Sequence, residues 1–266
     1  MGNKKPFFNR TRLLLGDEMM SRLDSARVII FGVGGVGSWC AEGLVRSGIG
    51  HLTIVDSDRV CITNVNRQMM ATSRTVGMVK VEALKERLLE INPDVDIQAV
   101  QAIYSEETAS QFDLDSYDYV VDAIDSLKDK AALILHATRS KARFFSSMGA
   151  ALKLDPTKIE VAEFWKVKGC PLARALRQRF KKKKEFPAKK FLCVYSDELI
   201  ENRGEESSWG TVRCVCPKTE SGPGDPSLAN HEWCSSKARI NGSLMHITSI
   251  FGLTLSGLIL KHLYKS

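Results

Sequence analysis

Residues 27–58, RVIIFGVGGVGSWCAEGLVRSGIGHLTIVDSD, constrain the fold more than any other part of the chain. The apolar run VIIF is typical of a buried strand, and SWCAEGLVRSG, which follows the glycines, has helical spacing. A second apolar run, HLTIV, ends in Asp56. A strand, a glycine-rich turn, a helix and a strand that ends in an acid together indicate a nucleotide-binding unit.

The glycine-rich turn contains Gly32, Gly34, Gly35 and Gly37. Glycines let the backbone approach a phosphate closely, and the N–H groups and dipole at the start of the next helix attract its negative charge. Asp56 is placed to accept hydrogen bonds from ribose hydroxyls. This pattern alone fits a dinucleotide and a mononucleotide equally well.

The following residues alternate between helical and extended patterns. Residues 75–93 have helical spacing, residues 94–100 alternate as a strand, and residues 117–125 form a buried strand that ends in an acid. A helix over 128–141 and a strand over 143–149 follow. The alternation predicts an α/β protein with a Rossmann-like, doubly wound and mostly parallel sheet.

The pattern is less regular in the second part of the chain, where residues 208–233 are rich in turn residues and predict a long loop. We therefore expect a nucleotide-binding core over residues 1–150 and a C-terminal extension, packed on the core and facing the substrate, over residues 151–266.

Polar and charged residues follow the strand that ends in Asp56. Parallel strands bring their carboxyl ends to one edge of a sheet, so these residues and Asp125, which ends the strand 117–125, are expected to lie together. Arg and Lys neutralise phosphate charge, and a carboxylate such as Asp125 binds the accompanying magnesium ion. This density favours a nucleoside triphosphate over a nicotinamide dinucleotide. The residues are Asp58, Asn66, Arg67, Gln68 and, on the next helix, Lys80.

The seven cysteines and the N-terminus indicate a reducing compartment. The first residues lack the apolar run of a signal peptide, so we expect free thiols and a cytoplasmic protein. Only Cys214 and Cys216 form a close pair, and Cys170, Cys193 and Cys234 are scattered. This spacing is poor for a structural zinc site.

The last apolar stretch, residues 242–260, approaches the length of a membrane span. Its hydroxyl side chains, a histidine and glycines suited to close packing favour a buried helix. A membrane tail anchor is the alternative.

The net charge of +7 is concentrated in residues 172–190, LARALRQRFKKKKEFPAKK. A solvated helix end is the simpler interpretation, and a surface for the phosphate backbone of a nucleic acid is the alternative. Charge alone favours the first.

Five segments in order, GVGGVGSW, IVDSD, NVNRQ, VGMVKVEA and DAIDS, resemble the adenylation domain of ubiquitin-activating enzymes and of bacterial thiamine- and molybdopterin-pathway adenylyltransferases. The resemblance implies that the glycine turn and Asp56 bind ATP, that Arg67 and Lys80 contact its phosphates, and that Asp125 binds Mg²⁺. It also implies a homodimer in which an N-terminal arginine enters the partner's site. Arg10 is the first choice for this role, and Arg12 is the second.

Within that superfamily the chain is most similar to the tRNA threonylcarbamoyladenosine dehydratase family. The segments RSGIG, DRVCITNVNRQ, INPDVDI, VVDAIDSLKDKAALI, CPLARALRQRF and FGLTLSGLIL carry this resemblance. It implies an ATP-dependent ligase-type reaction that cyclises a modified adenosine beside the tRNA anticodon through an acyl-adenylate. A tRNA substrate turns the basic segment into an expected RNA contact, which would use Arg174, Arg177, Lys181, Lys182, Lys183 and Lys184.

Two other function classes stay open. A related enzyme would activate the C-terminus of a sulfur-carrier or ubiquitin-like protein, with Cys193 or Cys234 as a candidate nucleophile, although a small buried side chain is the simpler interpretation of both. A nicotinamide-binding redox protein is the second class. In a eukaryotic host, a mitochondrial or membrane-associated location is the alternative to the cytoplasm.

Overall fold

The structure, a computed structural model, describes residues 5–204, 218–219, 222–223 and 241–265. Seven strands form one sheet in the order β3-β2-β1-β4-β5-β7-β6, in which β6 pairs antiparallel with β7 and the other pairs are parallel. The strands are β1 (Arg27–Phe31), β2 (His51–Val55), β3 (Asp96–Val100), β4 (Tyr119–Asp122), β5 (Arg143–Ser147), β6 (Ile159–Glu163) and β7 (Leu192–Ser196).

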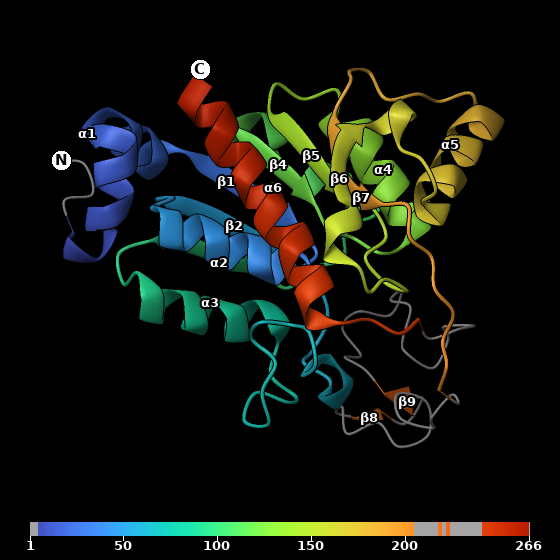
Figure 1. Cartoon of the computed structure of the whole chain (residues 1–266), viewed down its shortest axis with the longest axis horizontal. Helices are drawn as coiled ribbons and strands as arrows, with labels where there is room; N and C mark the ends of the chain where they lie inside the picture. The colour runs from blue at the N-terminus through green and yellow to red at the C-terminus, as the bar shows by residue number, and fades with distance from the viewer. Residues whose placement is uncertain (1–4, 205–217, 220–221, 224–240, 266) are drawn as a thin grey trace.

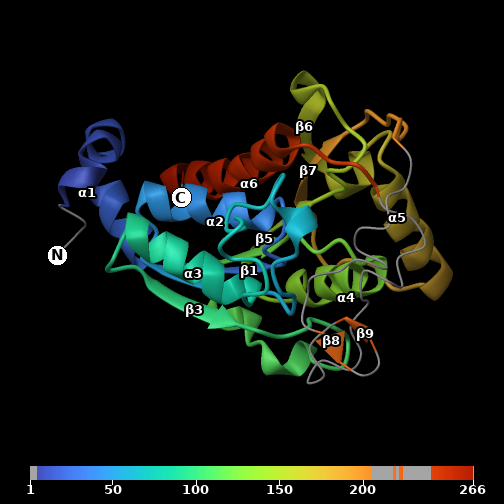
Figure 2. The ribbon, with the colours of Figure 1, turned by 90° about the horizontal axis from the view of Figure 1, so that it is seen from below.

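Among the described residues, helices cover the two faces of this sheet (Figures 1 and 2). One layer contains α1 (Asn9–Ser25), α2 (Gly37–Ser47), α3 (Lys80–Ile91) and α6 (Met245–Lys265), and the other contains α4 (Leu127–Ala137) and α5 (Pro171–Lys183). Successive residues of a strand point to opposite faces, so Val28 and Ile30 of β1 pack in the first layer and Ile29 and Phe31 in the second. The predicted Rossmann-like, doubly wound sheet is confirmed.

The predicted elements agree with the observed ones except at their ends. The helix expected over residues 128–141 ends at Ala137, where the Thr138 hydroxyl donates a hydrogen bond to the carbonyl oxygen of Ile134. The part of the chain after residue 150 supplies β6 and β7 to the same sheet. Its separate role as a substrate-facing extension stays a prediction.

The long loop predicted over residues 208–233 lies mostly outside the described residues. Within it, β8 (Lys218–Thr219) and β9 (Gly222–Pro223) form a short antiparallel pair.

The C-terminal helix α6 is long and apolar enough to cross a membrane by length and composition, and half of its most apolar window is buried inside the protein. It packs along α2, where Gly252 lies against the backbone of Val36 and Gly43 lies against the Ser256 side chain. Its buried residues include Phe251. The helix therefore forms part of the core, as the glycines and hydroxyls predicted.

Two edges of the sheet matter for function. We call the ends of the parallel strands, such as Phe31, Val55 and Asp122, the carboxyl edge, and their first residues, such as Arg27 and His51, the amino edge. From β1 the chain adds strands towards β3, and from β4 it adds strands towards the other end of the sheet. In folds of this kind, ligands bind outside the carboxyl edge at the point between β1 and β4 where this order changes.

Candidate nucleotide-binding site

The glycine turn joins β1 to α2 at the carboxyl edge. Gly32 has a φ of +84°, and a Cβ there would lie 2.8 Å from the carbonyl oxygen of Ala123 after β4. A Cβ on Gly37 would collide with the carbonyl oxygen of Gly32. The residue before the helix, Val36, provides no side-chain cap. The start of α2 thus has no side-chain cap, and an anion bound there, which such a helix N-terminus favours, stays a prediction.

Asp56 lies directly after β2 and reaches across to this turn. One carboxylate oxygen accepts a hydrogen bond from the N–H of Val33 (2.8 Å), and the other accepts one from the N–H of Asp58 (2.9 Å). Burial raises the pKa of Asp56, and the ammonium group of Lys80, 4.0 Å away, opposes that effect. Backbone contacts on both oxygens fix the carboxylate beside β1.

Lys80 is the first residue of α3 and is almost completely buried. Its Nζ lies 2.6 Å from Oδ2 of Asp58. Burial acts to lower the pKa of Lys80, but the carboxylates of Asp56 and Asp58 act against it more strongly, and the net pKa lies above its usual value. Lys80 is therefore a permanent cation at the carboxyl edge.

Asp125 and Arg67 approach this cation and the glycine turn from two other segments. Asp125 lies in the connection from β4 to α4, is exposed, and is close enough to Lys80 to contribute to the rise in its pKa. The Arg67 side chain lies over the turn, since a Cβ on Gly35 would be 3.3 Å from its Cγ. Its guanidinium donates hydrogen bonds to the carbonyl oxygen of Thr63 and to Oδ1 of its neighbour in the chain (both 2.9 Å).

Gln68 closes the same site. A Cβ on Gly34 would lie 3.7 Å from its Nε2. The side chain is 7% exposed, and its Oε1 is a buried acceptor without a hydrogen-bond partner among the described residues. Such an atom is costly unless a ligand donates to it. Nearby, the amide of Asn66 donates to the carbonyl oxygen of Ser243 before α6 (2.9 Å).

The structure thus brings most of the sequence-predicted residues to one edge. They are Gly32, Gly34, Gly35, Gly37, Asp56, Asp58, Asn66, Arg67, Gln68, Lys80 and Asp125.

Arg10 is not part of this group. It is an exposed residue of α1, and the start of that segment is tied to the amino edge, where Lys5 contacts Asn92 and Asp94 before β3.

The basic segment is also remote from the glycine turn. Gly169, just before α5, contacts Asp197 after β7, so α5 begins at the carboxyl edge. Lys189, beyond its far end, donates hydrogen bonds to the carbonyl oxygens of Ser140 and Ala142, which precede β5 at the amino edge (2.7 Å each). The helix rises about 20 Å over its 13 residues. Lys181–184 therefore lie at the edge opposite the glycine turn.

Sequence reasoning missed a buried ion pair below the site. The Nζ of Lys130 in α4 lies 2.8 Å from Oδ2 of Asp122, and both side chains are 0% exposed. The same oxygen accepts the Ser146 hydroxyl (2.6 Å), and Lys130 also donates to the carbonyl oxygen of Ile124 (2.8 Å). The pair holds the turn that leads to Asp125. The sequence feature that could have indicated this pair is Lys130 itself, a lysine among the apolar residues of the buried face of α4.

The cysteines and the metal site are described only in part, since Cys214, Cys216 and Cys234 lie outside the described residues. Cys193 is buried in β7, and burial raises the pKa of its thiol. In the described ranges, no group of three or more His, Cys, Asp or Glu residues is arranged to hold a metal ion.

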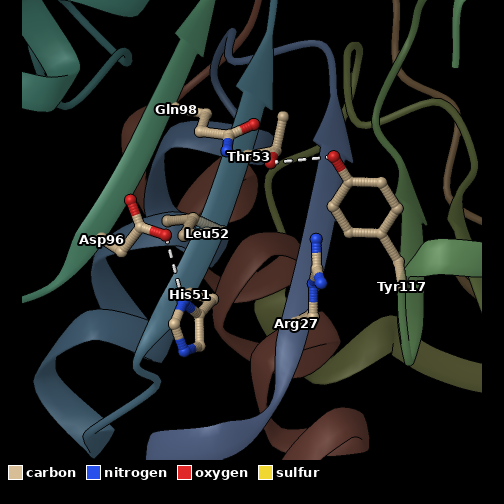
Figure 3. Close-up of a pocket in the computed structure, with 7 residues that line it drawn as sticks. All are labelled: Arg27, His51, Leu52, Thr53, Asp96, Gln98 and Tyr117. Atoms are coloured by element: carbon tan, nitrogen blue, oxygen red, sulfur yellow. Dashed lines mark hydrogen bonds and ion pairs between the residues drawn. The ribbon is translucent and has the colours of Figure 1, made fainter. Parts of the chain in front are cut away.

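A separate hollow of about 240 Å³ lies at the amino edge of β1, β2 and β3 (Figure 3). His51 and Asp96 line one side, where Nδ1 and Oδ2 are 3.1 Å apart, and Tyr117 lines the other, where its hydroxyl contacts that of Thr53 (3.1 Å). This position is opposite the glycine turn, so the hollow is not the nucleotide site.

The fold and the carboxyl-edge residues define a Rossmann-like protein with charged side chains around a glycine turn. The model of the ThiF family matches residues 8–264, and the chain belongs to this family. It is 38% identical over 221 residues to tRNA threonylcarbamoyladenosine dehydratase of Escherichia coli K12, covering 81% of each chain.

Solved structures agree with this relationship. The crystal structure of the E. coli tRNA N6-threonylcarbamoyladenosine dehydratase TcdA in complex with ATP matches with a TM-score of 0.77 and 32% identity, covering 96% of this chain and 93% of TcdA. The E. coli molybdopterin-synthase adenylyltransferase is more distant, at 30% identity over 65% of this chain and 68% of its own length.

Proposed function

We propose that this protein is an ATP-dependent tRNA threonylcarbamoyladenosine dehydratase. The observation that carries the proposal is the meeting of Arg67, Lys80 and Asp125 around the glycine turn, in a chain that matches dehydratases of this name over most of both lengths. A tRNA substrate is consistent with a cytoplasmic protein.

ATP fits the described groups. Asp56 stands where an acid accepts the ribose hydroxyls, and the buried Oε1 of Gln68 provides a further acceptor for a donor on the nucleoside. The phosphates would lie at the start of α2, between Arg67 and Lys80. The dehydratase TcdA was crystallised in complex with ATP, which favours ATP over a nicotinamide dinucleotide as the ligand of this chain.

The proposed reaction removes one water from the modified adenosine. The carboxylate of the threonyl group attacks the α-phosphate of ATP, an oxygen–phosphorus bond forms and pyrophosphate leaves. A nucleophilic group of the same substituent then attacks the acyl-adenylate carbonyl, loses its proton, closes a ring and expels AMP. Arg67 and Lys80 would stabilise the charge that builds on the phosphates, and positioning supplies much of the rate of an intramolecular closure.

A magnesium ion also fits this site. Mg²⁺ commonly binds one or two carboxylates together with substrate phosphates and water, rather than a cage of protein ligands. Asp125 is an exposed carboxylate close to Lys80 and would hold the ion against ATP. The ion would neutralise phosphate charge there.

The site is proposed to be completed by a second copy of the chain. Arg10 lies on α1, near the amino edge, and so is remote from the glycine turn of its own chain. The same helix exposes Leu13 (76%) and Leu14 (81%), and apolar side chains this exposed are typical of a surface that a partner covers. A homodimer would cover them and would bring Arg10 into the partner's site.

Mixing two inactive variants tests this arrangement. In the proposed dimer each site takes Asp125 from one chain and Arg10 from the other, so Arg10→Ala and Asp125→Ala each disable both sites of their own dimer. A mixed dimer contains one site in which both residues are intact. We expect the mixture to recover part of the tRNA-dependent AMP formation that each variant lacks. A mixture as inactive as its components, although light scattering shows mixed dimers, would contradict the role of Arg10.

The alternative function is activation of a sulfur-carrier or ubiquitin-like protein. The buried Cys193 thiol with its raised pKa is poorly suited to form a thioester with such a partner. Exchange of labelled pyrophosphate into ATP separates the two functions, because only the proper carboxylate substrate, which accepts the adenylyl group, drives it. We expect exchange with tRNA that carries threonylcarbamoyladenosine. Exchange with a carrier protein alone would contradict the proposal.

A further inference from the structure

A row of aromatic rings runs from the core to the surface beside α5. Phe144 contacts Phe191 (ring centroids 4.9 Å apart), Phe191 stacks on Phe164 (5.0 Å), and Phe164 meets Trp165 edge-on (5.2 Å). Trp165 in turn lies 6.2 Å from Phe186. The first three rings are buried, whereas Trp165 is 40% and Phe186 is 51% exposed. We call these last two the aromatic pair.

The aromatic pair is held in place by its neighbours. The N–H of Trp165 donates to Oε2 of Glu163 (3.2 Å), and Arg177 of α5 donates to the carbonyl oxygen of Phe164 (3.0 Å). On the other side, the N–H of Glu185 donates to the carbonyl oxygen of Phe180 and ends α5 just before Phe186. Two large rings are thus fixed at the surface before any ligand arrives.

The surroundings of the pair are strongly basic. Residues 164–190 contain eleven Lys and Arg and one acid, Glu185, a net charge of +10, while the whole chain carries +7. The ion pairs between described residues all lie elsewhere in the protein. The four lysines of residues 181–184 are exposed. This charge is available to an anionic partner.

We propose that Trp165 and Phe186 form a stacking site for an unpaired RNA base, whose flanking phosphates bind the lysines of residues 181–184. Aromatic rings beside a basic groove are the usual means of holding single-stranded nucleic acid, since every base has a face that stacks. The inference rests on the proposed function, in which the substrate is a tRNA, and it adds a recognition site that the reaction itself does not require.

A membrane surface is the competing partner, because it also attracts lysines and aromatic side chains. An interfacial helix needs a free apolar face. The apolar face of α5, formed by Ala173, Leu176 and Phe180, is buried against the sheet, so this helix has no such face left. RNA therefore fits the surface better than a bilayer does.

The position of the pair defines which base it would bind. Phe164 follows β6 and pairs with Phe191 just before β7, so the pair lies towards the amino edge, opposite the glycine turn. Figures 1 and 2 show α5 at the β6 end of the sheet, away from α3. The base that stacks there is consequently not the base that reacts, but another unpaired nucleotide of the same tRNA.

The test compares the salt dependence of tRNA binding for two kinds of variant. Stacking of one base contributes little charge, so Trp165→Ala and Phe186→Ala should each weaken tRNA binding about 5- to 100-fold without changing the slope of log affinity against log salt. Replacing Lys181–184 with alanines should flatten that slope. Trp165→Leu, which keeps apolar bulk, serves as a second variant in case alanine disturbs folding.

Phe7 provides the matched control, because it is an exposed aromatic residue (53%) next to Lys5, which contacts Asn92 before β3 at the opposite end of the sheet from β6. Phe7→Ala should bind tRNA as the unchanged protein does. Wild-type tRNA affinity in folded Trp165 and Phe186 variants would overturn the inference. So would a loss confined to binding of phosphatidylserine vesicles.

Pyrophosphate exchange by the unchanged protein separates this inference from the proposed function. Exchange driven by tRNA, together with normal tRNA binding by the aromatic variants, would remove the stacking site alone. Lack of any tRNA-driven exchange would remove the proposed function, whatever the aromatic variants do.

Discussion

The two edges of the sheet carry charge in opposite ways. At the carboxyl edge Lys80 is buried, and its ammonium contacts Asp58 beside the glycine turn. At the amino edge the lysines of residues 181–184 are exposed and form no ion pair with any described carboxylate. The few fixed charges of the carboxyl edge suit a small triphosphate that reacts there. The many exposed lysines of the amino edge suit a long polyanion that is bound but does not react there.

The largest effect is expected at the carboxyl edge. Asp125→Ala and Arg67→Ala should each lower kcat for tRNA-dependent AMP formation by at least about 10²-fold, because each removes a group that acts on charge developing in the transition state. Thermal unfolding should change little, since Asp125 is exposed. Arg74→Ala, which changes an exposed arginine a few residues after Arg67, is the control. Full activity in either folded variant would contradict the assignment of this site.

The next effect concerns stability rather than chemistry. Lys130→Met leaves the Asp122 carboxylate buried without its cation and should lower the free energy of unfolding by about 3–5 kcal/mol, measured by urea titration. The double variant Asp122→Leu, Lys130→Met should recover part of this loss. Lys128→Met, on the exposed side of α4, should change stability little. Equal stability of Lys130→Met and the unchanged protein would refute a structural role for the pair.

At the amino edge the expected effect is on affinity. Replacing Lys181–184 with alanines should weaken tRNA binding, and each lost phosphate contact should reduce the salt slope by about 0.7–0.9. ATP binding should stay the same, because the glycine turn lies at the other edge. Lys261→Ala combined with Lys265→Ala, at the exposed end of α6, is the control. An unchanged slope would contradict a contact with tRNA and would support the simpler interpretation of residues 181–184 as a solvated helix end.

The smallest effect is expected at the cysteines. Ring closure within one substrate needs no thioester on the enzyme, so the double variant Cys193→Ser, Cys234→Ser should retain most of its AMP formation. Mass spectrometry of the protein during turnover provides the second readout. A covalent adduct on either sulfur, or loss of turnover at normal stability, would move the protein to the carrier-activating class.

The sequence predicted the carboxyl edge well because its signals are local. Gly32 and Asp56 directly follow successive strands, and parallel pairing of those strands is enough to bring them together. Asp125 shortly follows β4 and reaches this edge by the same rule, and Lys80 reaches it because it begins α3 after the loop that follows β2. The exact contact between Lys80 and Asp58 depends on where α3 begins, and the pattern of the sequence does not specify that residue.

The remaining features depend on distant packing. Trp165 and Phe186 are 21 residues apart and meet only because α5 returns across the sheet. The sequence shows that residues 181–184 are lysines, but it does not show where they lie. Their position at the amino edge follows from the direction of α5. The partner of the buried Lys130, Asp122, lies on a strand that pairs with β1 and could not be inferred from spacing.

The central claim is that ATP at the carboxyl edge drives the loss of water from a modified tRNA base. Its most direct test is mass spectrometry of nucleosides from tRNA carrying threonylcarbamoyladenosine, after incubation with the unchanged protein, ATP and Mg²⁺. The proposal predicts that the modified nucleoside becomes lighter by one water while AMP and pyrophosphate form in equal amounts. An unchanged nucleoside mass in the presence of folded, ATP-binding protein would contradict it.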